Sequence, residues 1–466
     1  MSSVALKENK TQTLKENKMG TQPLNSLLLS TAIPLIISML VQALYNMVDS
    51  LYVSRLGQDA FNAVSLSFPI QNIMIAIAVG TGAGIVTLIS KSLGEKNFEK
   101  ANQFASNGVF LAVCSYLVML VFGIIGVEAF FKSQTDIAKI IEDGTEYLSI
   151  CCIFSFGAFG QILLERLMQS TGKSGLSMWT QLIGAVINIV LDPIFIFGWW
   201  IFPEMGVAGA AVATVAGQII SMIVGIILHH YYNKDVRVKL KGFKPNGKLI
   251  LAIYQIGVPS MLTAGIGSVM TFMMNKLLIA IETTATAAAV FGAYFKVQSF
   301  FVMPVLGLSN GMNPIVGYNL GAGNKQRILG VYRLSLRYGI CYMLLATASF
   351  LFIPDILLKI FNASELMLEI GVPAFRIISV AYIFAAYCII TSQFFTACGK
   401  SFLSLLMSLA RQLIILIPVA YLLGYTLGYK YVWFALPIGE LGSVAMAIFG
   451  RIRIQKLVLD RIPDKK

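Results

Sequence analysis

Apolar runs long enough to cross a membrane recur along almost the whole chain, and this recurrence excludes most folds. They begin near Thr31 and continue almost to Lys456, and only 12% of the 466 residues are charged. About 20 consecutive apolar residues span the hydrocarbon core of a bilayer as a helix. A soluble domain of this length cannot bury so much apolar surface, and the mean hydropathy of +0.77 agrees. The sequence therefore predicts an all-α polytopic membrane protein.

Twelve spans are expected, which places both termini on the same side of the membrane. The expected ranges are 31–54, 62–90, 103–127, 145–169, 176–201, 206–231, 249–281, 285–317, 331–354, 367–398, 402–427 and 431–455. Basic residues concentrate on one side of this topology, in the N-terminal segment and in 91–100, 234–248, 325–337 and 451–466. Because basic loops stay in the cytoplasm, both termini are predicted to be cytoplasmic. The net charge of +13 therefore reflects topology, and no nucleic-acid partner is expected.

The spans divide into two repeats of six. The glycine-rich residues 80–84, followed by LGEKN, match residues 307–311, followed by LGAGN, at an offset of 227. The same offset places Gly172-Lys-Ser on Gly399-Lys-Ser. Six is an even number, so both repeats share one orientation and are related by a pseudo-two-fold axis along the membrane normal. The predicted parts are a disordered cytoplasmic tail (1–23), a first lobe (24–233), a cytoplasmic linker (234–248), a second lobe (249–455) and a cytoplasmic tail (456–466).

Residue types that carry most enzyme and metal chemistry are sparse. The six cysteines lie in or beside apolar runs without metal-ligand spacing, and only two histidines occur. The glycine-rich stretches also lie inside apolar runs, where they allow close helix packing or bending. They do not follow a strand as a phosphate loop does. We therefore expect no metal site, no cofactor and no enzymatic activity. An intramembrane enzyme is a second alternative, which no His, Cys or Ser constellation supports.

A polar notch interrupts the fifth span. Asn188 and Asp192 lie one turn apart on one helix face, and Pro193 follows them and frees the carbonyl of Ile189. A charged residue at the centre of a membrane helix costs about 2.5 to 3.5 kcal/mol on insertion scales, and it is retained where it faces a cavity or a partner. A hydrogen-bonded packing notch would explain the amide alone. The neighbouring carboxylate favours a functional site.

A second carboxylate, Asp49, lies on a polar stripe with Gln42 and Asn46 in the first span. At 1.5 Å per residue, Asp49 and Asp192 both lie about 24 to 27 Å from the cytoplasmic ends of their spans. If the first and fifth helices are neighbours, the two carboxylates form a pair that cannot stay doubly ionised in a low dielectric without a large cost. Such a pair binds H⁺, or Na⁺ with the help of Asn188, and residue types alone do not separate the two ions.

The second lobe lacks an equivalent pair. Its charges at membrane depth include Lys296, Arg376 and Glu440, each about 13 to 17 Å from the outer end of its helix. We expect these three to pair, either as a structural network or as substrate contacts, whereas Arg411 lies nearer the cytoplasmic end and is expected to be an anchor. The candidate residues of a substrate cavity are Gln42, Asn46, Gln71, Tyr294, Lys296, Gln298, Arg376 and Glu440.

These motifs together resemble the multidrug and toxic compound extrusion (MATE) family over essentially residues 34–453, and most of all its bacterial multidrug branch. They are Pro34, Asp49, the two glycine-rich stretches, the two Gly-Lys-Ser turns, residues 188–193, residues 206–214 and Pro437-Ile-Gly-Glu440. The resemblance implies a V-shaped, two-lobe antiporter in the bacterial cytoplasmic membrane. Such a protein exports amphipathic cationic drugs or dyes in exchange for H⁺ or Na⁺ by alternating access, and we expect it to be a monomer.

The resemblance also implies an ion-coupling site at Asp49, Asn188 and Asp192, with Tyr147 and Thr214 as further matches. The acidic residue that some members carry in the seventh helix has no match within that span, and only Glu282 occurs at its outer end. This departure argues against cation coupling in the second lobe. The first alternative is a lipid-linked oligosaccharide flippase of the same superfamily, which would need a cationic central cavity.

Overall fold

The computed structural model describes residues 17–239, 241–282, 284–361 and 363–462, and the regular secondary structure in these residues is helical. The first lobe consists of α2 (Leu24–Ser54), α3 (Gln58–Gly94), α4 (Phe98–Ile125), α5 (Val127–Lys132), α6 (Ala138–Ile153), α7 (Phe156–Ser170), α8 (Ser174–Phe197) and α9 (Gly206–Tyr232). The second lobe consists of α10 (Gly247–Ile281), α11 (Thr286–Gly321), α12 (Lys325–Phe352), α13 (Pro354–Lys359), α14 (Glu365–Ser379), α15 (Ala381–Ala397), α16 (Ser401–Leu409), the π-helix η1 (Ala410–Leu416), α17 (Ile417–Leu427), α18 (Tyr429–Val432) and α19 (Ala435–Leu457). Short helices α1 (Lys18–Thr21) and η2 (Leu459–Arg461) flank the two lobes.

The predicted twelve spans are confirmed, with one refinement. Ten helices in the described residues are long and apolar enough to cross a membrane, and two bent pairs bring the total to twelve if each pair counts as one span. The pairs are α6 with α7, bent by 45°, and α14 with α15, bent by 51°. The expected spans 145–169 and 367–398 are therefore each broken into two helices.

The internal duplication extends to individual helices. Adding 227 to the first and last residue numbers of α4 gives those of α12, and the same shift turns the bounds of α5 into those of α13. The last residue of α7 corresponds in the same way to the last residue of α15. The caps correspond as well, because the side chains of Asn97 and Asn324 accept the backbone N–H groups of Lys100 and Arg327. The two predicted Gly-Lys-Ser turns also match, since Gly172 and Gly399 have φ of +78° and +74°.

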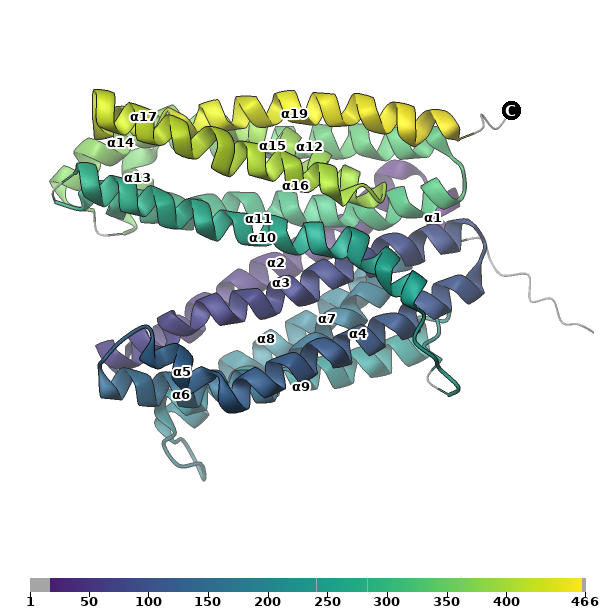
Figure 1. The fold of residues 1–466 in the computed structure, drawn as a ribbon, viewed down its shortest axis with the longest axis horizontal. Helices are drawn as coiled ribbons and strands as arrows, with labels where there is room; N and C mark the ends of the chain where they lie inside the picture. The colour runs from purple at the N-terminus through teal and green to yellow at the C-terminus, as the bar shows by residue number, and fades with distance from the viewer. Residues whose placement is uncertain (1–16, 240, 283, 362, 463–466) are drawn as a thin grey trace, which may run out of the picture.

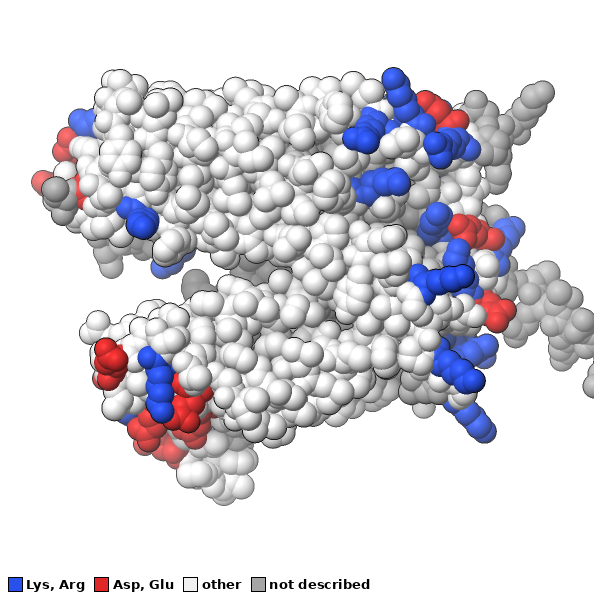
Figure 2. Space-filling model, in the orientation of Figure 1, with Lys and Arg blue, Asp and Glu red and all other residues white. Residues whose placement is uncertain are grey.

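The two lobes meet at one end and separate at the other. Helices α2 and α3 of the first lobe pack against α10 and α11 of the second. Figure 1 shows the lobes as the arms of a V, with the C-terminus and α1 at the closed end. Figure 2 shows the space between the arms at the opposite end, while lysines and arginines gather at the closed end. The predicted V-shaped, two-lobe architecture is therefore confirmed.

Two further glycines, outside the stretches predicted to allow close packing, permit the contact at the closed end. A Cβ atom added to Gly94 would lie 1.9 Å from the carbonyl oxygen of Tyr318, and one added to Gly321 would lie 2.0 Å from that of Lys91. Tyr318 and Lys91 are themselves 227 residues apart, so these two contacts are equivalent under the pseudo-two-fold symmetry. Only a residue without a side chain permits this approach of two backbones.

The expected disordered tail of residues 1–23 is wrong for the part that the structure describes. Residues 1–16 lie outside the described residues, but Asn17 caps α1 and the side chain of Met19 is fully buried. The linker is also docked, because the backbone N–H groups of Arg237 and Asn246 donate to Asn102 and Asn107 of α4.

Candidate functional site

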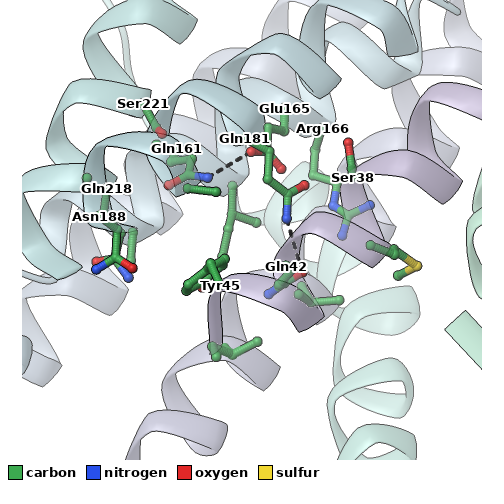
Figure 3. A pocket seen from close by; sticks show the side chains of 18 of the residues that line it. Ser38, Gln42, Tyr45, Gln161, Glu165, Arg166, Gln181, Asn188, Gln218 and Ser221 are labelled. Atoms are coloured by element: carbon green, nitrogen blue, oxygen red, sulfur yellow. Dashed lines mark hydrogen bonds between the residues drawn. The ribbon is translucent and has the colours of Figure 1, made fainter. Parts of the chain in front are cut away.

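A cavity of about 130 Å³ is lined mostly by the first lobe, and Asn310 on α11 of the second lobe also borders it. Figure 3 shows that side chains from α2, α7, α8 and α9 point into it, with the glutamines on several of its walls. Its polar lining residues are Ser38, Gln42, Tyr45, Gln161, Glu165, Arg166, Gln169, Gln181, Asn188, Asn310, Thr214, Gln218 and Ser221. Amide side chains predominate, and they offer both donors and acceptors to a bound molecule.

Asn188 connects this cavity to a buried carboxylate. Its side chain lines the cavity, and its amide nitrogen lies 3.2 Å from Oδ1 of Asp192 and 3.3 Å from Oγ1 of Thr214 on α9. Asp192 is fully buried, and its Oδ2 has no hydrogen-bond partner among the described residues. Helix α8 continues through Pro193 to Phe197. A buried carboxylate oxygen without a partner in a membrane helix indicates a site that binds a cation or a proton.

Asp49 lies on the helix that packs against this site. Helix α2 contacts α8 directly, as the paired-carboxylate hypothesis required. Oδ1 of Asp49 is also buried without a partner among the described residues. Hydrogen bonds thus connect Asn188, Asp192 and Thr214, and Asp49 lies on the helix packed against them.

Tyr147 makes no hydrogen bond to either carboxylate in the described part of the chain. It is buried on α6, where its hydroxyl accepts a hydrogen bond of 3.2 Å from the side chain of Gln71 on α3. Gln71, expected in the substrate cavity, therefore supports Tyr147 instead.

Only one of the predicted substrate-cavity residues lines this cavity. Gln42 does so, and its Oε1 accepts a bond of 3.1 Å from Gln181. Asn46 is exposed and lies outside the lining. In the second lobe, Tyr294 is buried in an aromatic cluster with Phe291 and Phe350. The half-buried Gln298 is likewise absent from the lining.

The expected network of Lys296, Arg376 and Glu440 is wrong. Glu440 pairs with Arg411 at 2.8 Å, whereas the ammonium of Lys296 lies 5.7 Å from the ring centroid of Phe361 and Arg376 is exposed. Arg411 belongs to the π-helix η1, which packs against α19, the helix that carries Glu440. The anchoring role expected for Arg411 is therefore wrong as well.

The sequence interpretation missed the charged residues of the cavity. Glu165 is 7% exposed, and its Oε1 accepts hydrogen bonds from Gln161 (3.0 Å) and Thr180 (3.4 Å). Arg166 donates to Gln169 at 2.8 Å, and its side chain passes over Gly82 of α3. A signal was present, because Gln161, Glu165 and Gln169 recur every four residues inside an expected span and predict one polar helix face.

Glu282 has a local role at the end of α10. One carboxylate oxygen accepts the backbone N–H of Thr284 at 2.8 Å and also bonds its hydroxyl, while the other accepts the N–H of Ala287 at 3.0 Å. These bonds satisfy backbone donors at the start of α11, where helices leave N–H groups without partners. Glu282 thus stabilises the turn between two helices.

Two six-helix lobes related by a pseudo-two-fold axis, with a polar cavity and buried carboxylates at membrane depth, define a membrane transporter. The sequence profile of the MatE family matches residues 34–194 and 259–422. The chain belongs to the MatE family of transporters, as its resemblance to multidrug and toxic compound extrusion proteins predicted, and it is not an enzyme.

Individual relatives match over nearly the whole chain. It is 27% identical over 429 residues to a FAD transporter of Shewanella oneidensis, covering 90% of this chain and 92% of that protein. It is 23% identical to the multidrug export protein MepA of Staphylococcus haemolyticus, covering 90% of this chain and 91% of that one. A structure described as an outward-facing conformation of a multidrug resistance MATE family transporter superposes with a TM-score of 0.88 at 25% identity, covering 96% of this chain and 99% of that chain.

Proposed function

We propose that this protein is a secondary active antiporter that exports small amphipathic organic cations in exchange for H⁺ or Na⁺. The observation that carries the proposal is Asp192, a fully buried carboxylate bonded to Asn188, which lines the cavity; Asp49 lies on the helix packed against it. A buried charge of this kind is costly in a membrane protein and is retained where it binds an ion or a substrate.

Ion binding at the carboxylate pair supplies the coupling. Asp49 lies on the helix packed against α8, and two ionised carboxylates close together in a low dielectric repel each other, so uptake of one H⁺ or Na⁺ relieves this repulsion. Asn188 bonds to Asp192 and also faces the cavity, so a change at the carboxylate alters the surface that a substrate contacts. The ion drives transport only through its different affinity for the two conformations, and such coupling free energies are about 1 to 3 kcal/mol.

The distribution of charge supports the orientation. Basic residues gather at the closed end, where the short helices α1 and η2 that flank the two lobes also lie. Because basic segments stay in the cytoplasm, this end is the cytoplasmic one. The cleft between the lobes then faces the outside, in the state that releases substrate and takes up the ion. We place the protein in the bacterial cytoplasmic membrane as a monomer, because one chain supplies the whole lining of the cavity and both carboxylates.

The cavity supports a cationic substrate. Glu165 is an acidic residue of its lining, and apolar side chains such as Met39, Met74 and Ile162 surround the amides. A carboxylate next to flexible apolar side chains suits amphipathic cations of varied shape. The relative MepA, described as a multidrug export protein, agrees with this substrate class.

A second candidate is the export of an anionic flavin nucleotide. Arg166 also lines the cavity, and the amides of Gln42 and Gln181 offer the paired donors and acceptors that a heteroaromatic edge requires. The relative described as a FAD transporter agrees with this candidate. A lipid-linked oligosaccharide flippase has less support, because the described cavity holds Glu165 as well as Arg166.

Efflux from proteoliposomes under separately imposed pH and Na⁺ gradients tests the proposal. With wild-type protein we expect one gradient to drive uphill efflux of a cationic dye. In Asp192→Asn, uphill efflux is expected to disappear while dye binding persists. Glu142→Gln is the control, because this side chain is 73% exposed and should leave efflux unchanged. Wild-type uphill efflux by Asp192→Asn at equal expression would remove Asp192 from the mechanism, and efflux of FAD alone would favour the second candidate.

A further inference from the structure

A short segment ahead of the first membrane helix crosses the seam between the lobes at the closed end. Residues 17–22 contain the single helical turn α1, which the side chain of Asn17 caps by accepting the N–H of Met19 at 3.0 Å. Met19 has no exposed surface and belongs to the main hydrophobic core. The side chain of Met19 is buried because residues of both lobes surround this segment.

One side of the segment contacts the first lobe. The amide of Asn17 donates to the carbonyl oxygen of Thr171 at 3.4 Å, in the turn between α7 and α8. The side chain of Met19 packs on the same turn, since a Cβ added to Gly172 would lie 3.2 Å from its Cγ. Gly172 adopts a positive φ, which glycine takes without steric cost, in the turn that Asn17 and Met19 contact.

The other side contacts the second lobe more strongly. The carbonyl oxygen of Met19 accepts hydrogen bonds from the side chains of Asn319 (3.0 Å) and Arg327 (3.1 Å). Arg327 donates a further bond of 2.8 Å to the carbonyl oxygen of Gln22. Hydrogen bonds from a guanidinium are stronger than those between neutral groups. The second lobe therefore holds the segment by its backbone, independent of most of its side chains.

The linker ahead of α10 and the segment 17–22 dock on equivalent helices of the two repeats. The linker docks on α4 of the first lobe, and the segment 17–22 docks at the start of α12, which is the equivalent helix of the second repeat. The linker is covalently joined to both lobes. The segment 17–22 is joined to the described fold only through α2, so it can leave its site without breaking the chain of either lobe.

We propose that residues 17–22 form a clasp that holds the lobes together at the closed end and must be released before this end opens. The inference rests on the proposed alternating-access function. When the closed end opens, Thr171 and Gly172 separate from Asn319 and Arg327, and a segment of six residues cannot keep both sets of contacts. The clasp thereby favours the conformation described here, and whatever displaces it favours the opposite one.

A buried thiol reports the opening directly. Ser90 has no exposed surface and faces Gly317 of the other lobe, so Ser90→Cys is an alkylation target only when the seam opens. The background carries Cys341→Ser and Cys114→Ser, which removes the exposed and the half-buried native thiols. The alkylation rate is measured in liposomes with a permeant maleimide, without substrate or ion gradient. The readout is therefore independent of whether transport is ion-coupled.

The clasp variants are Met19→Ser and Arg327→Gln, and the control is Met47→Ser, whose side chain is 69% exposed. Each clasp variant is expected to raise the alkylation rate at position 90 by about tenfold or more, the factor that corresponds to about 1.4 kcal/mol. The control is expected to keep the wild-type rate. Unchanged rates in both clasp variants would overturn the proposal, as would an equal rise in the control. Thermal unfolding of each variant in detergent identifies misfolding, and a rise seen only in a variant with lowered unfolding temperature also counts against the clasp.

Discussion

The contact between Gly94 and the backbone of α11 allows a quantitative prediction about the conformational equilibrium. In Gly94→Ala, the new Cβ would lie 1.9 Å from the carbonyl oxygen of Tyr318 and 2.9 Å from the backbone nitrogen of Ala322. Such contacts do not occur below 3.0 Å, so the two backbones must move apart by about 1.1 Å. No side chain can rotate away, because both neighbours are backbone atoms.

The strain favours separation of the lobes at the closed end. Overpacking a well-packed interface costs about 1 to 3 kcal/mol. That cost corresponds to a shift of about 5-fold to 150-fold in the equilibrium, since about 1.4 kcal/mol is a factor of ten. The strain disappears once this end opens, so Gly94→Ala is expected to increase the population of the opposite conformation. Gly321→Ala is expected to do the same, because its Cβ would lie 2.0 Å from the carbonyl oxygen of Lys91.

Spin labels at the half-buried Lys100 and the exposed Arg333 measure the distance between the lobes at this end. Both variants are expected to add a longer component to the distance distribution in nanodiscs. Gly175→Ala is the matched control, because a Cβ at that position meets no atom within 4 Å. If Gly94→Ala gives the same distances and the same unfolding temperature as Gly175→Ala, the close contact does not determine the equilibrium.

The ion pair of the second lobe, the coupling site of the first and the exposed Lys296 each give a further prediction. Arg411→Met leaves the carboxylate of the half-buried Glu440 without its partner and is expected to lower stability by about 1.5 to 3 kcal/mol. Adding Glu440→Leu should restore most of the unfolding temperature, and no recovery would contradict the ion pair. Thr214→Val removes the hydroxyl that accepts a hydrogen bond from Asn188, and it is expected to weaken ion-driven efflux severalfold at unchanged stability. An unchanged ion dependence would exclude Thr214 from the coupling site. Lys296→Ala removes an exposed cation–π contact and is expected to reduce efflux much less than substitution of Asp49 or Asp192 does. An equal loss of efflux in a folded protein would make Lys296 a transport residue.

Hydrophobic periodicity and internal repetition predicted most of the fold. Spans of sufficient apolar length, the offset of 227 and the glycine-rich stretches led to two six-helix lobes with close helix contacts. They did not predict the breaks between α6 and α7 or between α14 and α15, which a run of apolar residues does not reveal. They also assigned residues 17–23 to a disordered tail, because the burial of Met19 depends on two surfaces that are distant in sequence.

The candidate site shows the same division. The sequence by itself determined the depth of each polar residue, because a helix advances a constant 1.5 Å per residue, and this depth placed Asp49 near Asp192. It also brought Asn188 and Asp192 onto one face. Depth does not specify rotation about the helix axis or the neighbouring helix, so the network of Lys296, Arg376 and Glu440 was wrong. Only the tertiary structure decided that Glu440 meets Arg411, because it packs α19 against the π-helix η1 that carries Arg411.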